Sequence, residues 1–337
     1  MRRQPAPMAL GLLVAVVVVA LQALLVPLFA GPAANIAPRD LPIAVAGPLP
    51  AAQDLADRLE AEHPGAFDVR VVADGSAADQ AIRKRTVYGA VVLAPTGPSV
   101  HVASAAGPTV AALLTQSTAA LGNGNPVPVR DVVPTDADDP RGAGFGAAFL
   151  PLAMTGLLAD ALIFLLVRGR AARVAALITY AVLAGLAGAA VQQFWLSVLP
   201  GDYLADAGVM ALVALAIAAA VTGLGAILDR AGVALGAVMI FLVGNALSGV
   251  SSAPELLPQP WGEFGQWLPI GAGGTLLRSV AYFDGNGSAT AALVLATYVV
   301  LGLGMAALGR RGTTAPATEA AGLPAANGPD RQPALAR

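Results

Sequence analysis

A charged side chain inside a long apolar run is the residue of this sequence whose type and position most directly imply chemistry. Asp160 lies in such a run, about two helical turns before Arg168. A carboxyl group there either faces a water-filled path, where it carries protons or contacts a substrate, or hydrogen-bonds to a neighbouring helix, where its role is structural. The residues alone leave both roles open.

Polar and aromatic residues also gather between Gly244 and Gly285, in a passage that holds all but one of the tryptophans. Prolines divide the passage, and apolar residues recur within its pieces at helical spacing, which predicts short amphipathic helices at the membrane boundary. These helices either gate or brace the mouth of a path, or only anchor the protein. The candidate gate or brace residues are Glu255, Trp261, Glu263, Trp267, Arg278 and Asp284. We expect Arg278 to pair with one of the three acids.

Residues suited to enzymatic chemistry are scarce. The sequence has no cysteine, and its only histidines, His63 and His101, belong to no metal-binding or nucleophile motif. His101 alternates with two valines, so we expect it on the solvent face of a strand. The basic run 82–85 is expected on a solvated helix face, in preference to contact with lipid head groups or an anionic partner. The sequence therefore predicts a protein that is not an enzyme and uses no metal or cofactor.

The composition predicts a membrane protein. The chain is 56% hydrophobic and only 12% charged, with a mean hydropathy of +0.70, which is too apolar for the core of a soluble protein of this size. It gives no indication of nucleic-acid binding. An apolar helix needs about 20 residues to cross a bilayer, and six runs are long enough. These runs are residues 8–30, 144–167, 174–199, 207–228, 231–250 and 289–309.

Arginine gives the predicted orientation of the spans. Arg168, Arg170 and Arg173 fall on the same side as Arg230 and the arginines near both chain ends, whereas loop 200–206 on the other side carries only acids. Loops rich in Lys and Arg stay in the cytoplasm. We therefore expect a multi-pass protein of a bacterial plasma membrane with both termini cytoplasmic. The three arginines after the second span are candidates for coupling to a cytoplasmic partner.

Residues 31–143 lie between the first two spans and are expected to form an extracytoplasmic α/β domain. Apolar alternation predicts strands at 41–46, 68–72, 90–93, 100–103 and 127–133, and helical spacing predicts helices at 51–62, 76–87 and 109–121, the second of them capped by Ser76. Strands joined by helices favour a partly parallel sheet. The predicted fold class is a membrane all-α bundle of six transmembrane helices, with this domain inserted between helices 1 and 2. Outer interfacial helices are expected in 251–288, a cytoplasmic N-terminus in 1–7 and a disordered cytoplasmic tail in 310–337.

Small and amide residues in the fifth span offer helix contacts. Gly232 and Gly236 form a Gly-x-x-x-Gly pair, and Gly244 continues the same stripe. Such a stripe allows helices to approach closely, which predicts helix packing and a contact between two copies. Asn245 is a second candidate intramembrane polar residue, since its amide can hydrogen-bond across helices.

The passage also contains motifs that are similar to those of a known family. They are Gly244-Asn245-Ala246-Leu247-Ser248-Gly249, Pro254-Glu255-Leu256-Leu257-Pro258, Trp267-Leu268-Pro269-Ile270-Gly271-Ala272, Leu277-Arg278-Ser279 and Tyr282-Phe283-Asp284-Gly285. With the topology of one span, a large outer domain and five spans, they resemble the permeases of ABC-2 type exporters, most of all their phage-infection-protein-like branch. The resemblance implies a homodimer in membrane lipid that exports an amphipathic or lipid-like substrate.

The sequence has no Gly-x-x-x-x-Gly-Lys-Ser/Thr phosphate loop, so ATP hydrolysis would belong to a separate subunit. The short loops 168–173 and 229–230 leave such a subunit little surface to contact. Two other functions stay open. One is a membrane-anchored receptor or envelope scaffold whose domain 31–143 binds a protein or cell-wall ligand. The other is a proton-coupled transporter that uses Asp160.

Overall fold

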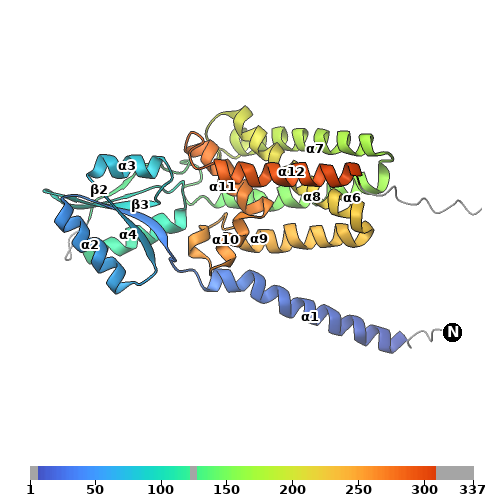
Figure 1. Cartoon of the computed structure of the whole chain (residues 1–337), viewed down its shortest axis with the longest axis horizontal. Coiled ribbons are helices and arrows are strands. Elements are labelled where there is room, and N and C mark those ends of the chain that lie inside the picture. Colours follow the sequence, from blue (N-terminus) through green and yellow to red (C-terminus); the bar gives the residue numbers. More distant parts are fainter. Residues whose placement is uncertain (1–6, 122–126, 309–337) are drawn as a thin grey trace, which may run out of the picture.

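The computed structural model describes residues 7–121 and 127–308. The predicted N-terminus 1–7, apart from Pro7, and the predicted tail 310–337 therefore lie outside the described residues. The described part of the chain is mostly helical, with several long apolar helices and a small mixed sheet (Figure 1). We call residues 41–131 the sheet region and residues 143–308 the helical region.

In the described residues of the sheet region, five strands form one sheet. They are β1 (Leu41–Ala46), β2 (Phe67–Val72), β3 (Gly89–Ala94), β4 (Gly97–Val102) and β5 (Val129–Asp131), in the order β2-β1-β3-β4-β5. β1 pairs in parallel with β2 and β3, β4 is antiparallel to β3, and β5 is parallel to β4. The predicted partly parallel pairing is confirmed.

Three helices cover the two faces of this sheet. They are α2 (Leu49–Glu62) and α4 (Pro108–Leu121) on one face and α3 (Gly75–Arg83) on the other (Figure 1). Successive side chains of a strand point to opposite faces, so Leu41 and Ile43 of β1 pack on the α2 and α4 side, whereas Ala44 packs on the α3 side. The cap of α3 is Asp74, whose side chain accepts a hydrogen bond from the Ala77 amide at 2.9 Å, so the predicted Ser76 cap is wrong.

Among the described residues, five helical segments are long and apolar enough to cross a membrane, by length and composition. They comprise α1 (Pro7–Ala34); α5 (Ala143–Ala147) with α6 (Phe149–Leu166); α7 (Arg170–Ala190) with η1 (Val191–Trp195); α8 (Tyr203–Ala237) with η2 (Val238–Val243) and α9 (Gly244–Leu247); and α12 (Ala289–Leu308). The third predicted span ends at Trp195 rather than at 199. We call the end of the helical region beside the sheet the sheet end, and the opposite end, where α6 meets α7, the arginine end.

The segment Tyr203–Leu247 is 45 residues long, but it reverses direction at Asp229. The backbone there is not helical, with φ of 53° and ψ of −137°. Beyond it, a Cβ on Gly232 would lie 2.0 Å from the Leu224 carbonyl oxygen, and one on Gly236 would lie 3.2 Å from the Val221 Cα. The halves 203–228 and 230–247 therefore pack side by side and run antiparallel. These halves correspond to the separate spans predicted at 207–228 and 231–250.

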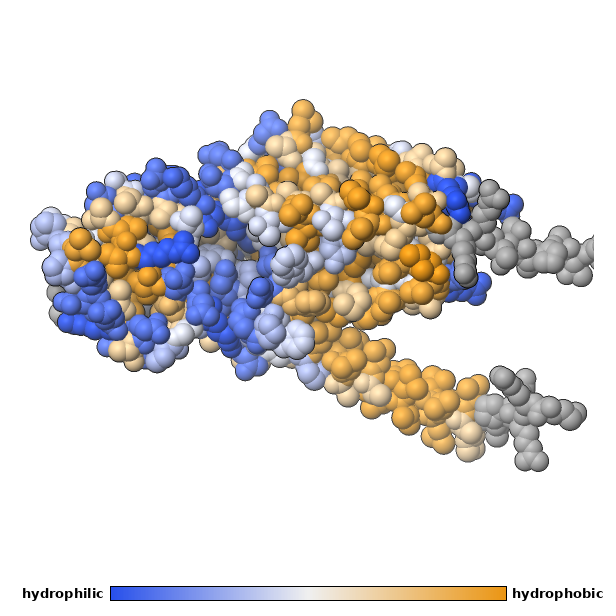
Figure 2. All heavy atoms as spheres, viewed as in Figure 1, coloured by the Kyte–Doolittle hydropathy of each residue, from blue (hydrophilic) through white to orange (hydrophobic). Residues whose placement is uncertain are grey.

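Helix α1 stands apart from the other helices. It diverges from the helical region along most of its length and meets the rest of the chain near the sheet end (Figure 1). Its side chains are mostly exposed, although most of them are apolar. Figure 2 shows apolar residues covering α1 and much of the helical region, while hydrophilic residues gather over the sheet region.

The passage between Gly244 and Gly285 is divided as its prolines predict, into η3 (Pro254–Leu256), α10 (Trp261–Gln266) and α11 (Pro269–Tyr282). α10 exposes its aromatic side chains, but most of α11 is buried against α8 and α12. The part of the predicted interfacial segment 251–288 that forms α11 is therefore not a surface helix but lies inside the helical region. Glycine explains the burial, because a Cβ on Gly273 would meet Val213 at 2.7 Å and one on Gly274 would meet Val250 at 2.5 Å.

Candidate functional site

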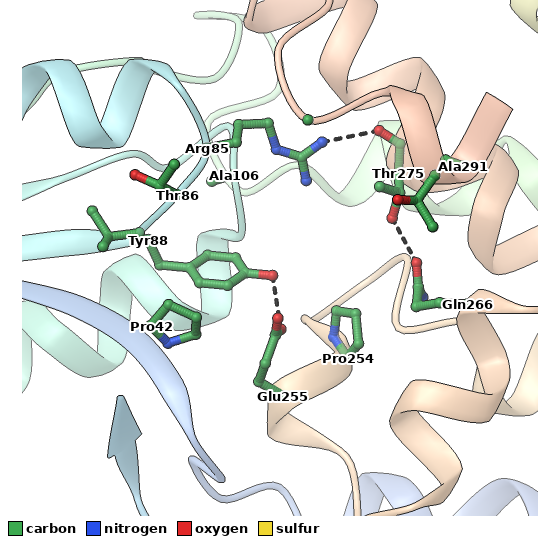
Figure 3. A pocket seen from close by; sticks show the side chains of 13 residues that line it. Pro42, Arg85, Thr86, Tyr88, Ala106, Pro254, Glu255, Gln266, Thr275 and Ala291 are labelled. Atoms are coloured by element: carbon green, nitrogen blue, oxygen red, sulfur yellow. Dashed lines mark hydrogen bonds between the residues drawn. The ribbon is translucent and has the colours of Figure 1, made fainter. Parts of the chain in front are cut away.

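A polar pocket of about 280 Å3 lies where the sheet region rests on the helical region (Figure 3). We call it the junction pocket. Its walls come from the segment after α3, from η3, and from α11 and α12. The lining residues are Pro42, Arg85, Thr86, Val87, Tyr88, Ala106, Pro254, Glu255, Gln266, Thr275, Gly287, Thr290 and Ala291. Arg85 is the only base among them and Glu255 the only acid.

Arg85 crosses from the sheet region to α11. Its backbone adopts a φ of 55° just after the end of α3, and its side chain is half-buried, whereas Arg83 is exposed. The guanidinium donates to the Thr275 carbonyl at 3.0 Å and to the Ser279 hydroxyl, and it lies 5.3 Å from the Phe283 ring centroid. Burial lowers the pKa of Arg85, against the opposing effect of nearby Tyr88 and Glu255. The predicted solvated face is therefore wrong for Arg85.

Tyr88 and Glu255 join the same two regions. The Tyr88 hydroxyl donates a hydrogen bond of 2.8 Å to Glu255 Oε2 (Figure 3). Burial, followed by the negative charge of Glu255, raises the pKa of Tyr88, so the phenol keeps its proton and remains a donor. Next to this pair, the Arg39 amide donates to the Glu255 carbonyl at 3.0 Å and the Ala37 amide donates to the Leu256 carbonyl at 3.2 Å. The junction is thus held by both backbone and side-chain bonds.

Arg278 lies deeper, behind the junction pocket. Its side chain is buried; it donates to the Val250 carbonyl at 2.9 Å, and its guanidinium lies 4.7 Å from the Phe145 ring centroid. It forms no ion pair with any acid in the described residues, so the expected pairing with Glu255, Glu263 or Asp284 is wrong. Burial and then the positive charge of Arg85 lower the pKa of Arg278 to about 10. Two neighbouring cations therefore lie at the junction, on α11 and beside it.

An apolar groove of about 540 Å3 continues from this pocket along the helical region. Thr290, near the start of α12, lines both the junction pocket and the groove, and the adjacent residues Gln266 and Trp267 line one each. The groove residues are Ala220, Leu224, Trp267, Thr290, Leu293, Val294, Thr297, Tyr298, Leu301, Gly302 and Met305. From Thr290 to Met305 the helix rises by about 22 Å, which is most of the apolar thickness of a bilayer. A polar pocket thus adjoins an apolar groove.

The other predicted gate residues lie on the surface around this site. Trp261 and Trp267 are exposed, and Trp261 packs edge-on against Phe264 of α10. Of these, only Trp267 reaches the groove. Glu263 and Asp284 are exposed and line neither cavity. The structure therefore brings Glu255 and Trp267 into the site and leaves the remaining surface residues outside it.

The predicted glycine stripe packs inside the chain. Gly232 and Gly236 lie against the half 203–228 of the same helical segment, and Gly244 lies near Ile270 of α11. This face is covered, so the expected contact between two copies through it is wrong. Asn245 is half-buried in α9 at the sheet end, and its carbonyl accepts a hydrogen bond from Ser248.

Asp160 is a residue of α6 that faces α8, and it lines neither the junction pocket nor the groove. Its side chain is completely buried, and Oδ1 accepts a hydrogen bond from the Thr222 hydroxyl. Its Oδ2 has no hydrogen-bond partner among the described residues. Arg168, Arg170 and Arg173 lie about two turns beyond it at the arginine end, and all three line a second pocket there.

A cluster in the sheet region was not predicted. His101 Nδ1 lies 2.6 Å from Asp79 Oδ1, and Arg130 lies 3.0 Å from Asp79 Oδ2. His101 is buried rather than on a solvent face, because α3 covers the side of the sheet opposite to its valine neighbours. The helices expected on this sheet were the sequence signal for the burial of His101. A sheet that helices cover on both faces buries both sets of alternating residues. No group of three or more potential metal ligands occurs in the described part of the chain.

Comparison with known proteins finds no family model, no curated protein and no solved structure that matches this chain.

Proposed function

We propose that the chain is a membrane permease that binds an amphipathic or lipid-like molecule, with the polar group in the junction pocket and the apolar part in the groove. The observation that supports this proposal is the shared wall at Thr290, which joins a polar pocket containing Arg85 and Glu255 to an apolar groove. An amphipathic molecule needs both environments at once, because burial of a charged group without partners is costly and exposure of an apolar chain to water is unfavourable.

In the full proposal, six helices cross a bacterial plasma membrane, with Tyr203–Leu247 supplying two of them. The sheet region then lies outside as a domain between the first two spans, and both termini lie in the cytoplasm. Two features support this arrangement: the reversal at Asp229 and the arginines clustered at the end opposite the sheet region. Two copies would form the export path, with ATP hydrolysed by a separate subunit that contacts the arginine end.

The binding site is tested by filling the groove. Thr297→Trp places a large side chain among the groove residues, whereas Gly304→Trp places the same side chain on α12 where no atom lies within 4 Å of a Cβ. The full chain is reconstituted in vesicles that contain a photoreactive phospholipid, and crosslinked peptides are identified by mass spectrometry. We expect crosslinks on the groove residues of α12 in the wild type and in Gly304→Trp, and their loss in Thr297→Trp. Equal crosslinking in all three proteins would contradict the site.

The transport step needs a separate test. Full-length protein is purified from its host by affinity capture, with crosslinking through a reagent placed at Arg168. We expect an ATPase to be captured, and we expect deletion of the protein to raise the sensitivity of the host to a lipophilic compound. If no ATPase is captured, ATP-driven export is excluded while the amphiphile site remains open to its own test.

One observation favours a second candidate function, proton-coupled transport. Asp160 is fully buried between two helices, and one of its carboxyl oxygens has no partner among the described residues. Intramembrane acids in this setting often relay protons. Asp160→Asn keeps the shape of the side chain and removes its titration, so pH-dependent flux in reconstituted vesicles would be abolished. Flux that keeps its pH dependence would exclude this function and leave Asp160 as a structural partner of Thr222.

A further inference from the structure

The second pocket of interest opens at the arginine end, between α6, α7, α8 and α12, and has a volume of about 420 Å3. Its lining runs from Asp229 at the reversal to Thr222, seven residues earlier on the same helix. This interval spans about 10 Å along the helix axis, from the exposed Asp229 to the buried Thr222. The feature is therefore a cavity that can enclose a small charged group rather than a shallow patch of surface charge.

Positive charge dominates this cavity. Arg168, Arg170 and Arg173 line it, and Asp229 is the only acid among the lining residues. Arginine presents a planar fork of donors that matches the oxygens of a phosphate or carboxylate, and it stays charged when partly enclosed. An anion is therefore the complementary ligand.

Two local features position charge around the cavity. Arg173 donates from Nε to the Val167 carbonyl at 2.8 Å and from Nη2 to the Phe164 carbonyl at 3.1 Å, which fixes its guanidinium at the end of α6. The 21-residue helix α7 begins at Arg170, and no side chain caps it, because its N-cap is Gly169. Gly169 and Arg170 both line the cavity. The uncapped amides and the helix dipole at such a terminus attract negative charge.

The remaining walls are apolar. The other lining residues are Phe164, Leu165, Val174, Leu177, Gly225, Ala226 and Ala306, and Leu165 is largely exposed on the apolar outer surface of α6. We propose that this pocket binds a phosphate group, carried either by the head group of an anionic lipid or by a soluble phosphate compound. The site is separate from the junction pocket, and its test does not depend on transport.

The test uses the full chain in two arms. In the first, the protein is placed in lipid nanodiscs of phosphatidylcholine with or without phosphatidylglycerol, and lipid retention is measured by native mass spectrometry. In the second, inorganic phosphate is titrated into the protein in detergent, and the thermal unfolding temperature is followed. Arg168→Gln is compared with Arg230→Gln, which removes the same charge at the same end from an exposed residue that does not line the pocket.

We expect Arg168→Gln to weaken binding about tenfold, the loss of one charge-assisted contact, and Arg168→Lys to restore part of it. Arg230→Gln should change binding less than about twofold, because Arg230 does not line the pocket. Binding in the first arm alone identifies the lipid as the source of the phosphate, and binding in the second alone identifies a soluble compound. Equal losses in Arg168→Gln and Arg230→Gln, or no binding in either arm, would overturn the proposal.

Discussion

The hydrogen bond between Tyr88 and Glu255 gives the sharpest prediction about how the sheet region is attached. Tyr88→Phe removes only the hydroxyl that donates to Glu255 Oε2 at 2.8 Å, and it leaves the ring in place. A hydrogen bond to a charged group contributes about 1.5 to 3 kcal/mol net. Because each 1.4 kcal/mol is a factor of about ten, the junction should open about ten to one hundred times more often in the variant.

Two backbone amides report this opening directly. The amides of Ala37 and Arg39 donate to the carbonyls of Leu256 and Glu255, so they exchange with solvent when the junction separates. Separation at these carbonyls also breaks the bond from Tyr88 to the same glutamate. Hydrogen–deuterium exchange of peptides covering 35–41, measured on the full chain in detergent, should therefore show exchange faster by the same factor.

A matched control removes a tyrosine hydroxyl elsewhere. The Tyr203 hydroxyl donates to the Leu186 carbonyl at 3.0 Å within the helical region, so Tyr203→Phe should leave exchange at 35–41 unchanged. If Tyr88→Phe exchanges at the wild-type rate, or no faster than Tyr203→Phe, then the bond to Glu255 does not hold the junction.

Three further predictions concern pH, packing and the buried cluster. The pKa of Tyr88 is raised in the folded chain above its ordinary value of 10.0, so the stability that its hydroxyl adds to the folded chain is complete below about pH 10 and is lost as the pH rises further. The difference in unfolding temperature between the wild type and Tyr88→Phe should therefore narrow above pH 10. A widening difference would contradict the burial of the phenol. Gly265→Ala would place a Cβ 1.7 Å from the Leu247 carbonyl oxygen, so it should lower the free energy of unfolding by more than about 1 kcal/mol in thermal unfolding. Gly208→Ala is the control, because no atom lies within 4 Å of a Cβ at Gly208, and it should be neutral or slightly stabilising. Asp79→Ala removes the acceptor 2.6 Å from His101 and should lower the protection of β4 amides against hydrogen exchange by about 1.5 to 3 kcal/mol. Asp79→Asn should lower this protection less. Equal protection in the wild type and both variants would show that the pair does not stabilise the strand.

The long apolar helices and the strands were predictable because their signals are local. A run such as 8–30 is long and apolar enough to span a bilayer whatever its neighbours do, and an alternating run such as 68–72 favours a strand. Asp229 with Arg230 also marked the break between two apolar runs, and the structure places a reversal there. In the site, the sequence indicated Glu255 and Trp267 because they belong to a passage whose composition differs from that of its surroundings.

The rest depended on contacts between distant segments. The passage around α11 reads as an amphipathic surface helix, but its glycines let α8 and Val250 approach, so the helix is buried and Arg278 bonds to a carbonyl instead of an acid. Arg85 belongs to a run of charge that resembles a solvated face, yet its partners on α11 lie nearly two hundred positions away in the sequence, as the hydrogen bond to Thr275 across 190 residues shows. No local pattern contains that information.

The sequence by itself therefore determined which segments are apolar, which of them are long enough to cross a membrane, and where polar residues interrupt them, because these properties follow from the chain's own composition and period. Only the tertiary structure decided that Arg85, Tyr88 and Glu255 meet in one pocket and that this pocket adjoins an apolar groove at Thr290. The physical reason is that a pocket forms only where packing places separate surfaces next to each other. Helix α11 contacts both the sheet region and α12, and its glycines allow it to pack inside the helical region.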